Sequence, residues 1–280
     1  MTAPMHDVSA DRALKDKHRA MWALGDYPAV AADLVGPLGP RVVEATDVAA
    51  TDRVLDIAAG TGNGAIAAAA RGAAVVASDL TPELLEAGRA IADARGLTVS
   101  WDVADAEALP YPDDSFDVVV SAIGIMFAPH HQAAADEALR VCRPGGRLGF
   151  ASWTPQGFIG QLFATMRPYV PPPPPGAQPP PLWGDEEHVR ELLGSRVTDL
   201  KFRREKLRVD QFDRPADFRD YFKSRYGPTI AAYRNVGTDA DRVAALDSDL
   251  AELARTHDLE PGKTVLDWEY LLVTARKAAP

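Results

Sequence analysis

Short apolar runs alternate with helix-forming stretches over the first half of the chain. The apolar runs occupy residues 54–57, 73–79, 97–101, 115–123 and 148–153. Short continuous apolar runs, such as 115–123, are typical of buried parallel strands. Helix-forming stretches follow several of these runs, at 65–70 and at 133–141. A third helix is expected to start after the second run, with Thr81 as its N-cap and Pro82 at its first helical position. This alternation predicts an α/β fold whose doubly wound, mostly parallel sheet contains these strands.

The second half of the chain has a different pattern. Prolines crowd residues 171–175 and 179–181, which predicts an extended, stiff connection between a helix at 158–166 and one starting near Asp185. Residues 197–209 and 263–275 are expected to form the sixth and seventh strands. Helical patterns at 216–226, 229–234 and 239–257 are too long for a plain connection. They indicate a small helical cap.

The first apolar run ends in a glycine-rich turn that opens onto a helix. Such a strand–turn–helix brings backbone N–H groups and a helix N-terminus against a nucleotide-like ligand. Glycine allows close approach and a positive φ. Gly60-x-Gly62-x-x-Ala65 fits the dinucleotide fingerprint, and Asp79 lies about twenty positions on. A dinucleotide, S-adenosylmethionine and a purely structural turn all remain compatible with this pattern.

Carboxylates near the strand ends favour S-adenosylmethionine. Asp56 precedes the glycines, where it would repel a pyrophosphate but attract the ammonium of an amino acid. Asp79 ends the second run and can accept hydrogen bonds from both ribose hydroxyls. Asp105 is placed to accept from an adenine amine while the Ala106 N–H meets a ring nitrogen. The alternatives are a solvated turn carboxylate for Asp79 and a loop cap for Asp105.

Together, four motifs resemble the class I S-adenosylmethionine-dependent methyltransferases, closest to the ubiquinone/menaquinone-biosynthesis branch (methyltransferase type 11). The motifs are VLDIAAGTGNG, the acid in SDLTPELLEAGR, DAEALPYPDDSFDVVVS and RVCRPGGRLGFASW. The resemblance covers roughly residues 50–155 and implies a Rossmann-like seven-stranded sheet. One departure is Ala58, where the family usually has glycine.

The resemblance also implies cofactor contacts. The expected cofactor residues are Asp56, Ala58, Gly60, Gly62, Asp79, Leu80, Asp105, Ala106 and Ser121. In related enzymes an N-terminal helical segment folds over the cofactor. This makes Trp22 and Tyr27 candidates for the methionine or substrate side, since aromatic faces suit a sulfonium cation. Core packing of these two rings is the alternative.

Methyl transfer from a sulfonium is an in-line displacement, and much of its rate can come from positioning the acceptor. A general base is needed only when the pKa of the acceptor is high. His130 and His131 follow the fourth strand and are the candidate bases, with loop or cap roles as the alternative. The expected walls of the acceptor pocket, with core packing as the alternative, are Met126, Trp153, Phe222 and Tyr226.

Several methyltransferase classes lack support in this sequence. Ser121-Ala122-Ile123-Gly124 stands where enzymes that methylate a base amine carry an Asn/Asp-Pro-Pro-aromatic motif. No Pro-Cys nucleophile and no metal-ligand cluster of the catechol type is present. The expected acceptor is therefore a small, largely apolar metabolite, with oxygen the favoured atom and nitrogen or carbon open. An NAD(P)-dependent oxidoreductase and a non-catalytic cofactor-binding module are the alternatives.

Composition narrows the partners. A formal net charge of −10 argues against nucleic acid, because phosphate binding needs a basic face. The single cysteine, Cys142, excludes an internal disulfide and fits a reducing compartment. No run reaches transmembrane length and no signal pattern opens the chain. We expect a cytoplasmic monomer or homodimer without a membrane partner and without a bound metal.

These patterns predict consecutive segments along the chain. A disordered tail (1–12) precedes an N-terminal helical segment over the cofactor (13–48) and the S-adenosylmethionine-binding core (49–156). A helical and proline-rich cap segment (157–195), a sixth-strand region (196–212), a helical cap insertion (213–260) and a seventh strand (261–280) follow. The proline segment is expected to be a rigid internal connection, with docking of a partner as the alternative.

Overall fold

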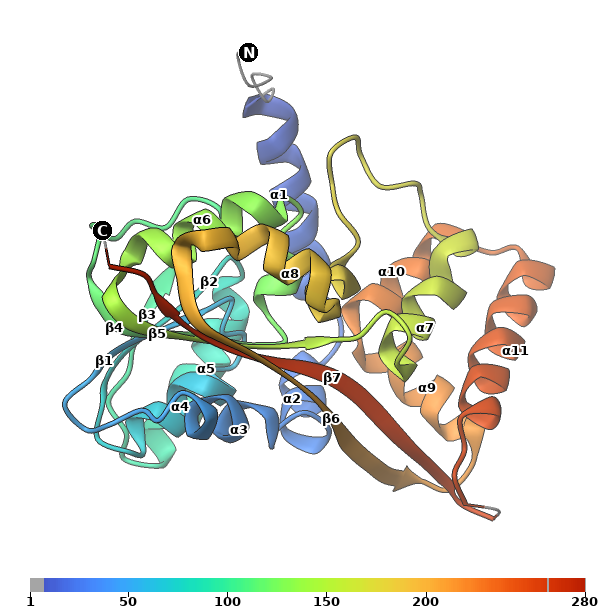
Figure 1. Cartoon of the computed structure of the whole chain (residues 1–280). Coiled ribbons are helices and arrows are strands. Elements are labelled where there is room, and N and C mark those ends of the chain that lie inside the picture. Colours follow the sequence, from blue (N-terminus) through green and yellow to red (C-terminus); the bar gives the residue numbers. More distant parts are fainter. Residues whose placement is uncertain (1–7, 261, 280) are drawn as a thin grey trace.

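The computed structural model describes residues 8–260 and 262–279, and its centre is a seven-stranded sheet (Figure 1). The strand order is β3-β2-β1-β4-β5-β7-β6. Neighbouring strands from β3 to β5 pair in parallel, whereas β7 is antiparallel to both β5 and β6. The strands are β1 (Arg53–Ile57), β2 (Ala74–Asp79), β3 (Ser100–Val103), β4 (Phe116–Ala122), β5 (Cys142–Trp153), β6 (Val197–Phe212) and β7 (Thr264–Lys277). The predicted doubly wound, mostly parallel sheet is confirmed.

Helices cover both faces of the sheet (Figure 1). On one side lie α3 (Leu38–Ala45) and α4 (Asn63–Ala69), and on the other lie α6 (His131–Val141) and α8 (Glu186–Leu193). Helix α5 (Pro82–Ala94) packs against β2 and β3. Because both faces are covered, Val118, Val119 and Val120 of β4 are fully buried. This explains why β4 appears in the sequence as a continuous apolar run.

A second group of helices gathers beyond the parallel strands, beside the long β6–β7 pair (Figure 1). They are α7 (Phe158–Met166), α9 (Pro215–Arg225), α10 (Gly227–Val236) and α11 (Ala240–Thr256). Phe158 of α7 stacks on Trp268 of β7, with 5.9 Å between ring centroids, and meets Phe218 of α9 edge-on at 5.1 Å. Aromatic pairs of this kind add to the stabilisation from burial alone. They fix this helical group to the end of the sheet.

The N-terminal segment forms α1 (Val8–Trp22) and α2 (Tyr27–Asp33). Residues 8–12 are thus helical, and the expected disordered tail is wrong for them; residues 1–7 lie outside the described residues. An ion pair between Lys15 and Asp11, one helical turn apart, supports this start.

Three local expectations also differ from the structure. The turn expected at 143–147 lies within β5: Phe116 of β4 pairs with Cys142 and Val118 with Arg147, so the residues between Cys142 and Arg147 form a bulge. Thr81 precedes α5 as expected, but its side chain makes no cap hydrogen bond to the helix. The third strand begins at Ser100 instead of Leu97.

Among the helices that the structure describes, none is long and apolar enough to cross a bilayer.

Candidate functional site

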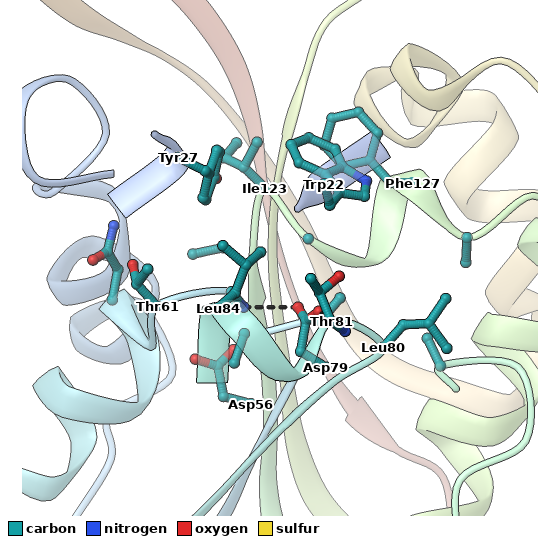
Figure 2. Close-up of a pocket in the computed structure, with 18 of the residues that line it drawn as sticks. Trp22, Tyr27, Asp56, Thr61, Asp79, Leu80, Thr81, Leu84, Ile123 and Phe127 are labelled. Carbon is teal, nitrogen blue, oxygen red and sulfur yellow. Dashed lines mark hydrogen bonds between the residues drawn. The ribbon is translucent and has the colours of Figure 1, made fainter. Parts of the chain in front are cut away.

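A cavity lies at the carboxyl ends of β1, β2 and β4 (Figure 2), where open α/β sheets bind ligands. With the solvent space at its mouth it measures about 970 Å³. Asp56 of β1 and Asp79 of β2 lie on its floor, the glycine turn forms one wall, and α1 and α2 contribute Trp22 and Tyr27. The cavity is therefore built from the core and from the N-terminal segment.

The turn after β1 has the backbone conformation that its glycines permit. Gly60 and Gly62 have positive φ values of 57° and 81°, and Gly62 is the N-cap of α4. Ala58 also has a positive φ, 51°, which costs a residue with a Cβ about 1–2 kcal/mol. The turn folds so tightly over β1 that a Cβ at Gly64 would lie 2.8 Å from Oδ2 of Asp56.

Asp56 is a buried carboxylate, and only one of its two oxygens accepts a hydrogen bond from the described residues. The Ala65 N–H donates to Oδ2 at 2.7 Å, whereas Oδ1 has no hydrogen-bond partner among the described residues. Burial raises the pKa of Asp56 to about 7, and the nearby Asp79 contributes in the same direction. The floor of the cavity thus holds an acid that would be stabilised in its charged form by a cation.

Asp79 is held by two backbone donors. The Gly60 N–H donates to Oδ2 and the Thr81 N–H to Oδ1, both at 2.8 Å. Burial raises the pKa of Asp79, and these backbone hydrogen bonds oppose the shift. Each carboxylate oxygen has more than one acceptor site, so Asp79 can still accept from hydroxyl groups in the cavity.

Aromatic rings lie opposite the acidic floor (Figure 2). Trp22 meets Tyr27 edge-on at 5.3 Å and Phe127 at 4.7 Å between ring centroids. Burial and the charge of Asp79 raise the pKa of Tyr27, which keeps its hydroxyl protonated at neutral pH. The cavity therefore combines buried carboxylates with aromatic faces, two kinds of group that favour a cationic ligand.

Sequence comparison relates this chain to methyltransferases. A methyltransferase-domain family model matches residues 54–146. A Mycobacterium tuberculosis protein described as uncharacterized (Rv1405c) is 52% identical over 267 residues, which cover 95% of this chain and 96% of that protein. The demethylmenaquinone methyltransferase of Thermus thermophilus is 42% identical over 117 residues, covering 41% of this chain and 53% of that enzyme. This chain belongs to the class I S-adenosylmethionine-dependent methyltransferases.

Solved structures show the same fold for this methyltransferase. The YcgJ protein of Bacillus subtilis superposes with a TM-score of 0.61 at 20% identity, covering 87% of this chain and 99% of that protein. A putative methyltransferase of Bacillus halodurans gives a TM-score of 0.59 at 21% identity, covering 86% of this chain and 99% of that protein. Because both identities are low, these likenesses concern the fold.

Most of the cofactor residues expected from the sequence line the cavity of the methyltransferase. The structure brings together Asp56, Ala58, Gly60, Asp79, Leu80, Asp105, Ala106, Trp22 and Tyr27. Gly62 does not line the cavity, because the ring of Trp101 covers it; a Cβ at Gly62 would lie 2.5 Å from this ring. Ser121 is also outside, since its hydroxyl donates to the Ile57 carbonyl at 2.6 Å and accepts from the Ile125 N–H at 2.8 Å. Their predicted cofactor contacts are therefore corrected: Gly62 shapes the turn, and Ser121 joins β4 to β1.

Neither expected histidine base lines the cavity. His131 is fully buried, with Nδ1 2.9 Å from Nε2 of His188, and burial and the neighbouring His188 lower its pKa to about 3. The first turn of α6 directs it towards α8, so its predicted role as a base is wrong. His130 instead contacts Glu107, with Nδ1 2.9 Å from Oε2, and its N–H donates to Oε1 at 2.7 Å.

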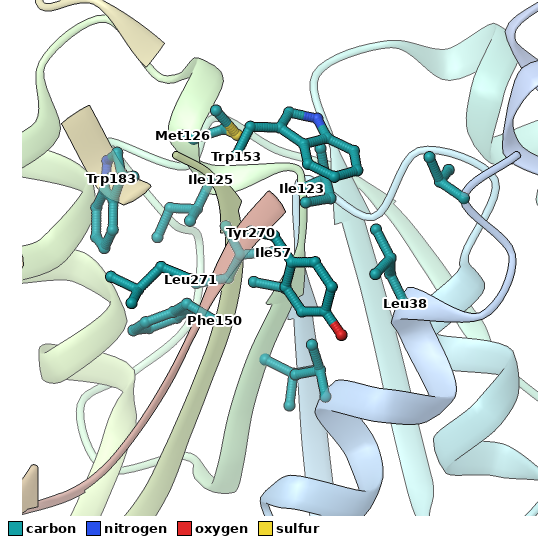
Figure 3. Packing of buried hydrophobic residues seen from close by; sticks show 14 of the residues in the cluster. Leu38, Ile57, Ile123, Ile125, Met126, Phe150, Trp153, Trp183, Tyr270 and Leu271 are labelled. Atoms are coloured by element: carbon teal, nitrogen blue, oxygen red, sulfur yellow. The ribbon is translucent and has the colours of Figure 1, made fainter. Parts of the chain in front are cut away.

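The residues expected to wall the acceptor pocket are buried in the core. Met126 and Trp153 pack among the apolar side chains shown in Figure 3, and Phe222 and Tyr226 lie in the aromatic cluster of α9. None of the four lines the cavity, so this prediction is corrected. All four have the alternative role, core packing, because helices and strands that are distant in sequence cover them. Tyr226 reaches the site indirectly, through an edge contact with Trp22 at 5.8 Å.

Several lining residues were not identified from the sequence. Lys15 and His18 face the cavity from α1, together with Trp22. Their spacing, i, i+3 and i+7, places all three on one side of a helix, and this periodicity is the sequence signal that could have identified them. Ile123 and Phe127 line the cavity just after β4. Ile123 has a φ of 61°, an unusual conformation for a β-branched residue.

Proposed function

We propose that this methyltransferase binds S-adenosylmethionine in the cavity and methylates a small, largely apolar metabolite, with oxygen the favoured acceptor atom and nitrogen or carbon as alternatives. The observation that carries this proposal is the distribution of charge. Among the described lining residues, Lys15 is the one lysine or arginine, and its ammonium contacts three carboxylates. Such a cavity suits a cationic cofactor and a neutral acceptor.

The methionine half of the cofactor would lie against Asp56. Its ammonium can meet the unpartnered Oδ1, which offsets the cost of ionising this buried acid. Asp79 would accept the ribose hydroxyls, and Asp105 and Ala106 lie where the adenine is expected. A nicotinamide dinucleotide would instead bring its pyrophosphate towards two buried carboxylates, which is repulsive at short range.

The acceptor would lie beside Trp22, Tyr27 and Phe127, whose rings exclude water from the sulfonium. The bound cofactor would supply the methyl group: its sulfur–methyl bond would break as the oxygen–methyl bond forms, and S-adenosylhomocysteine would leave as the neutral thioether. Among the lining residues that the structure describes, His18 is the one histidine, and burial, the largest influence, lowers its pKa. A neutral imidazole there can accept the hydroxyl proton, a role the sequence had suggested for His130 and His131.

Calorimetry with S-adenosylhomocysteine and with NADH tests the cofactor. We expect binding of S-adenosylhomocysteine and no response to NADH; the opposite pattern would overturn the assignment. Transfer of labelled methyl from S-adenosylmethionine to phenols, amines, carboxylates and quinone-like compounds then tests the acceptor. We expect turnover of neutral hydroxylated compounds, whereas turnover confined to carboxylates would contradict the proposed acceptor class. A cytoplasmic location and a monomeric or homodimeric state stay predictions from the sequence.

A further inference from the structure

Helix α1 is attached to the rest of the protein in two different ways at its two ends. At its C-terminal end, Trp22 packs edge-on against Tyr27, Phe127 and Tyr226. Gly227 approaches the backbone there so closely that a side chain at this position would collide with the Met21 carbonyl. This end of α1 is anchored by aromatic packing.

The rest of α1 has little apolar packing. Between residues 11 and 22 no side chain is fully buried, and half of them are exposed. In Figure 1 the N-terminal part of the helix extends away from the sheet. Segments with few buried apolar contacts open at low free-energy cost. Yet Lys15 and His18 of this same stretch line the cavity, so α1 covers a site without being packed into the core.

Ion pairs of Lys15 connect this part of α1 to the core. Its Nζ lies 2.6 Å from Oδ2 of Asp105 and 2.9 Å from Oε2 of Glu107, both in the loop between β3 and β4. A third contact, at 2.9 Å, is to Asp11 on the helix itself. The Lys15 side chain is 15% exposed and that of Glu107 only 5%. Ion pairs shielded from water in this way are less screened than pairs on the surface.

Asp105 and Glu107, the core partners of Lys15, are held in place by further hydrogen bonds. Oδ1 of Asp105 accepts from the Glu107 N–H at 2.9 Å. Glu107 in turn accepts from the His130 N–H at 2.7 Å and contacts the His130 ring. The two carboxylates therefore keep their positions without α1. Burial is the largest single influence and lowers the pKa of Lys15, but the hydrogen bonds to Asp105, Asp11 and Glu107 together raise this pKa by more, so the ammonium is charged at neutral pH.

We propose that Lys15, Asp105 and Glu107 form a latch that holds α1 closed over the cavity, with the aromatic contacts of Trp22 as the hinge. When the latch opens, the Lys15 end of α1 lifts and the ligand enters or leaves. The use of S-adenosylhomocysteine as the test ligand rests on the proposed function. The latch itself rests on the contacts of Lys15.

A latch affects ligand kinetics in a characteristic way. If the ligand can enter and leave only when α1 is open, weakening the closed state raises both the association and the dissociation rate constants. A lysine that merely attracted or contacted the ligand would change one of them. We expect Lys15→Met to raise both rate constants roughly five- to thirtyfold, as loss of one or two kcal/mol would.

The experiment is stopped-flow fluorescence of the full chain with S-adenosylhomocysteine, with tryptophan emission as the signal. Lys17→Met is the matched control, because Lys17 is exposed on the same helix and does not line the cavity. We expect this control to stay close to the wild type. Lys15→Arg keeps the charge and should restore slow exchange.

Hydrogen exchange of the ligand-free proteins gives a second readout that needs no cofactor. Amides of residues 11–18 should exchange faster in Lys15→Met than in the wild type or Lys17→Met, while the sheet amides stay protected. Unchanged exchange of this segment in a folded Lys15→Met protein would overturn the latch, as would a change in dissociation alone. Failure of the wild type to bind S-adenosylhomocysteine would count against the proposed function, and hydrogen exchange would still decide whether the latch exists.

Discussion

Replacing Asp56 with asparagine is expected to stabilise the ligand-free protein at neutral pH and to weaken binding of S-adenosylhomocysteine. The carboxylate is 1% exposed, and one of its oxygens has no partner among the described residues. Asparagine has nearly the same shape, and its carbonyl oxygen can still accept from the Ala65 N–H, which now donates to Asp56 at 2.7 Å. The substitution therefore removes the ionisation and keeps the structural hydrogen bond.

The size of the effect follows from the pKa of Asp56. Burial raises it to about 7 in the folded protein, against an ordinary value of 3.8. Between these two pH values the folded state binds a proton that the unfolded state does not, so rising pH destabilises the wild type through this residue. The loss is about 1.4 kcal/mol per pH unit within that window. Each kcal/mol corresponds to a change in Tm of roughly 2–4 °C for a protein of similar size.

Thermal unfolding followed by circular dichroism between pH 5 and pH 8 measures this effect. The Tm of Asp56→Asn minus that of the wild type should grow by several degrees from pH 5 to pH 7. Taking this difference cancels the contributions of other titrating groups. Calorimetry at pH 8 should show binding of S-adenosylhomocysteine weakened by about 1.5–3 kcal/mol, as for loss of a hydrogen bond to a charged group.

Two results would refute the reasoning about Asp56. A difference in Tm that is independent of pH would mean that the carboxylate ionises at an ordinary pKa, so burial would not penalise its charge. A pH-dependent difference combined with unchanged affinity for S-adenosylhomocysteine would mean that Asp56 does not meet the ammonium of the ligand.

Three further substitutions test the turn and the buried histidine by thermal unfolding. Ala58→Gly should raise stability by about 0.5–1 kcal/mol, because glycine adopts the φ of 51° without strain, and a lower Tm would contradict this. Gly62→Ala should cost about 1–3 kcal/mol, since the new methyl group meets Trp101 at a φ of 81°; an unchanged Tm would show that the ring moves freely. His131→Leu should remove part of the acid destabilisation: burial lowers the pKa of His131 to about 3, so the wild type loses about 1.4 kcal/mol per pH unit as pH falls below 6.5. Equal losses in both proteins between pH 6.5 and pH 5 would show that His131 is not held neutral.

Local sequence signals determined the parallel half of the fold and the acidic floor of the site. The continuous apolar run of β4 and the glycine turn after β1 are produced by residues that are neighbours in sequence. Since parallel strands end at the same edge of a sheet, Asp56 and Asp79 had to meet there once the strands were known. Helix α7 likewise has the expected bounds, because its apolar pattern is continuous from Phe158 to Met166.

Only the tertiary structure decided which side chains face the cavity and which face the core. Met126 and Phe222 are apolar whether they line a pocket or fill the interior, and burial by distant helices selected the interior. His130 and His131 are adjacent, yet α8 covers one and the other contacts Glu107. In the sequence, Lys15 does not differ from other charged residues of an exposed helix. Only the fold shows that the loop between β3 and β4 places two carboxylates beside it. Sequence periodicity specifies the face of an element, whereas the partner of that face is set by packing between segments far apart along the chain.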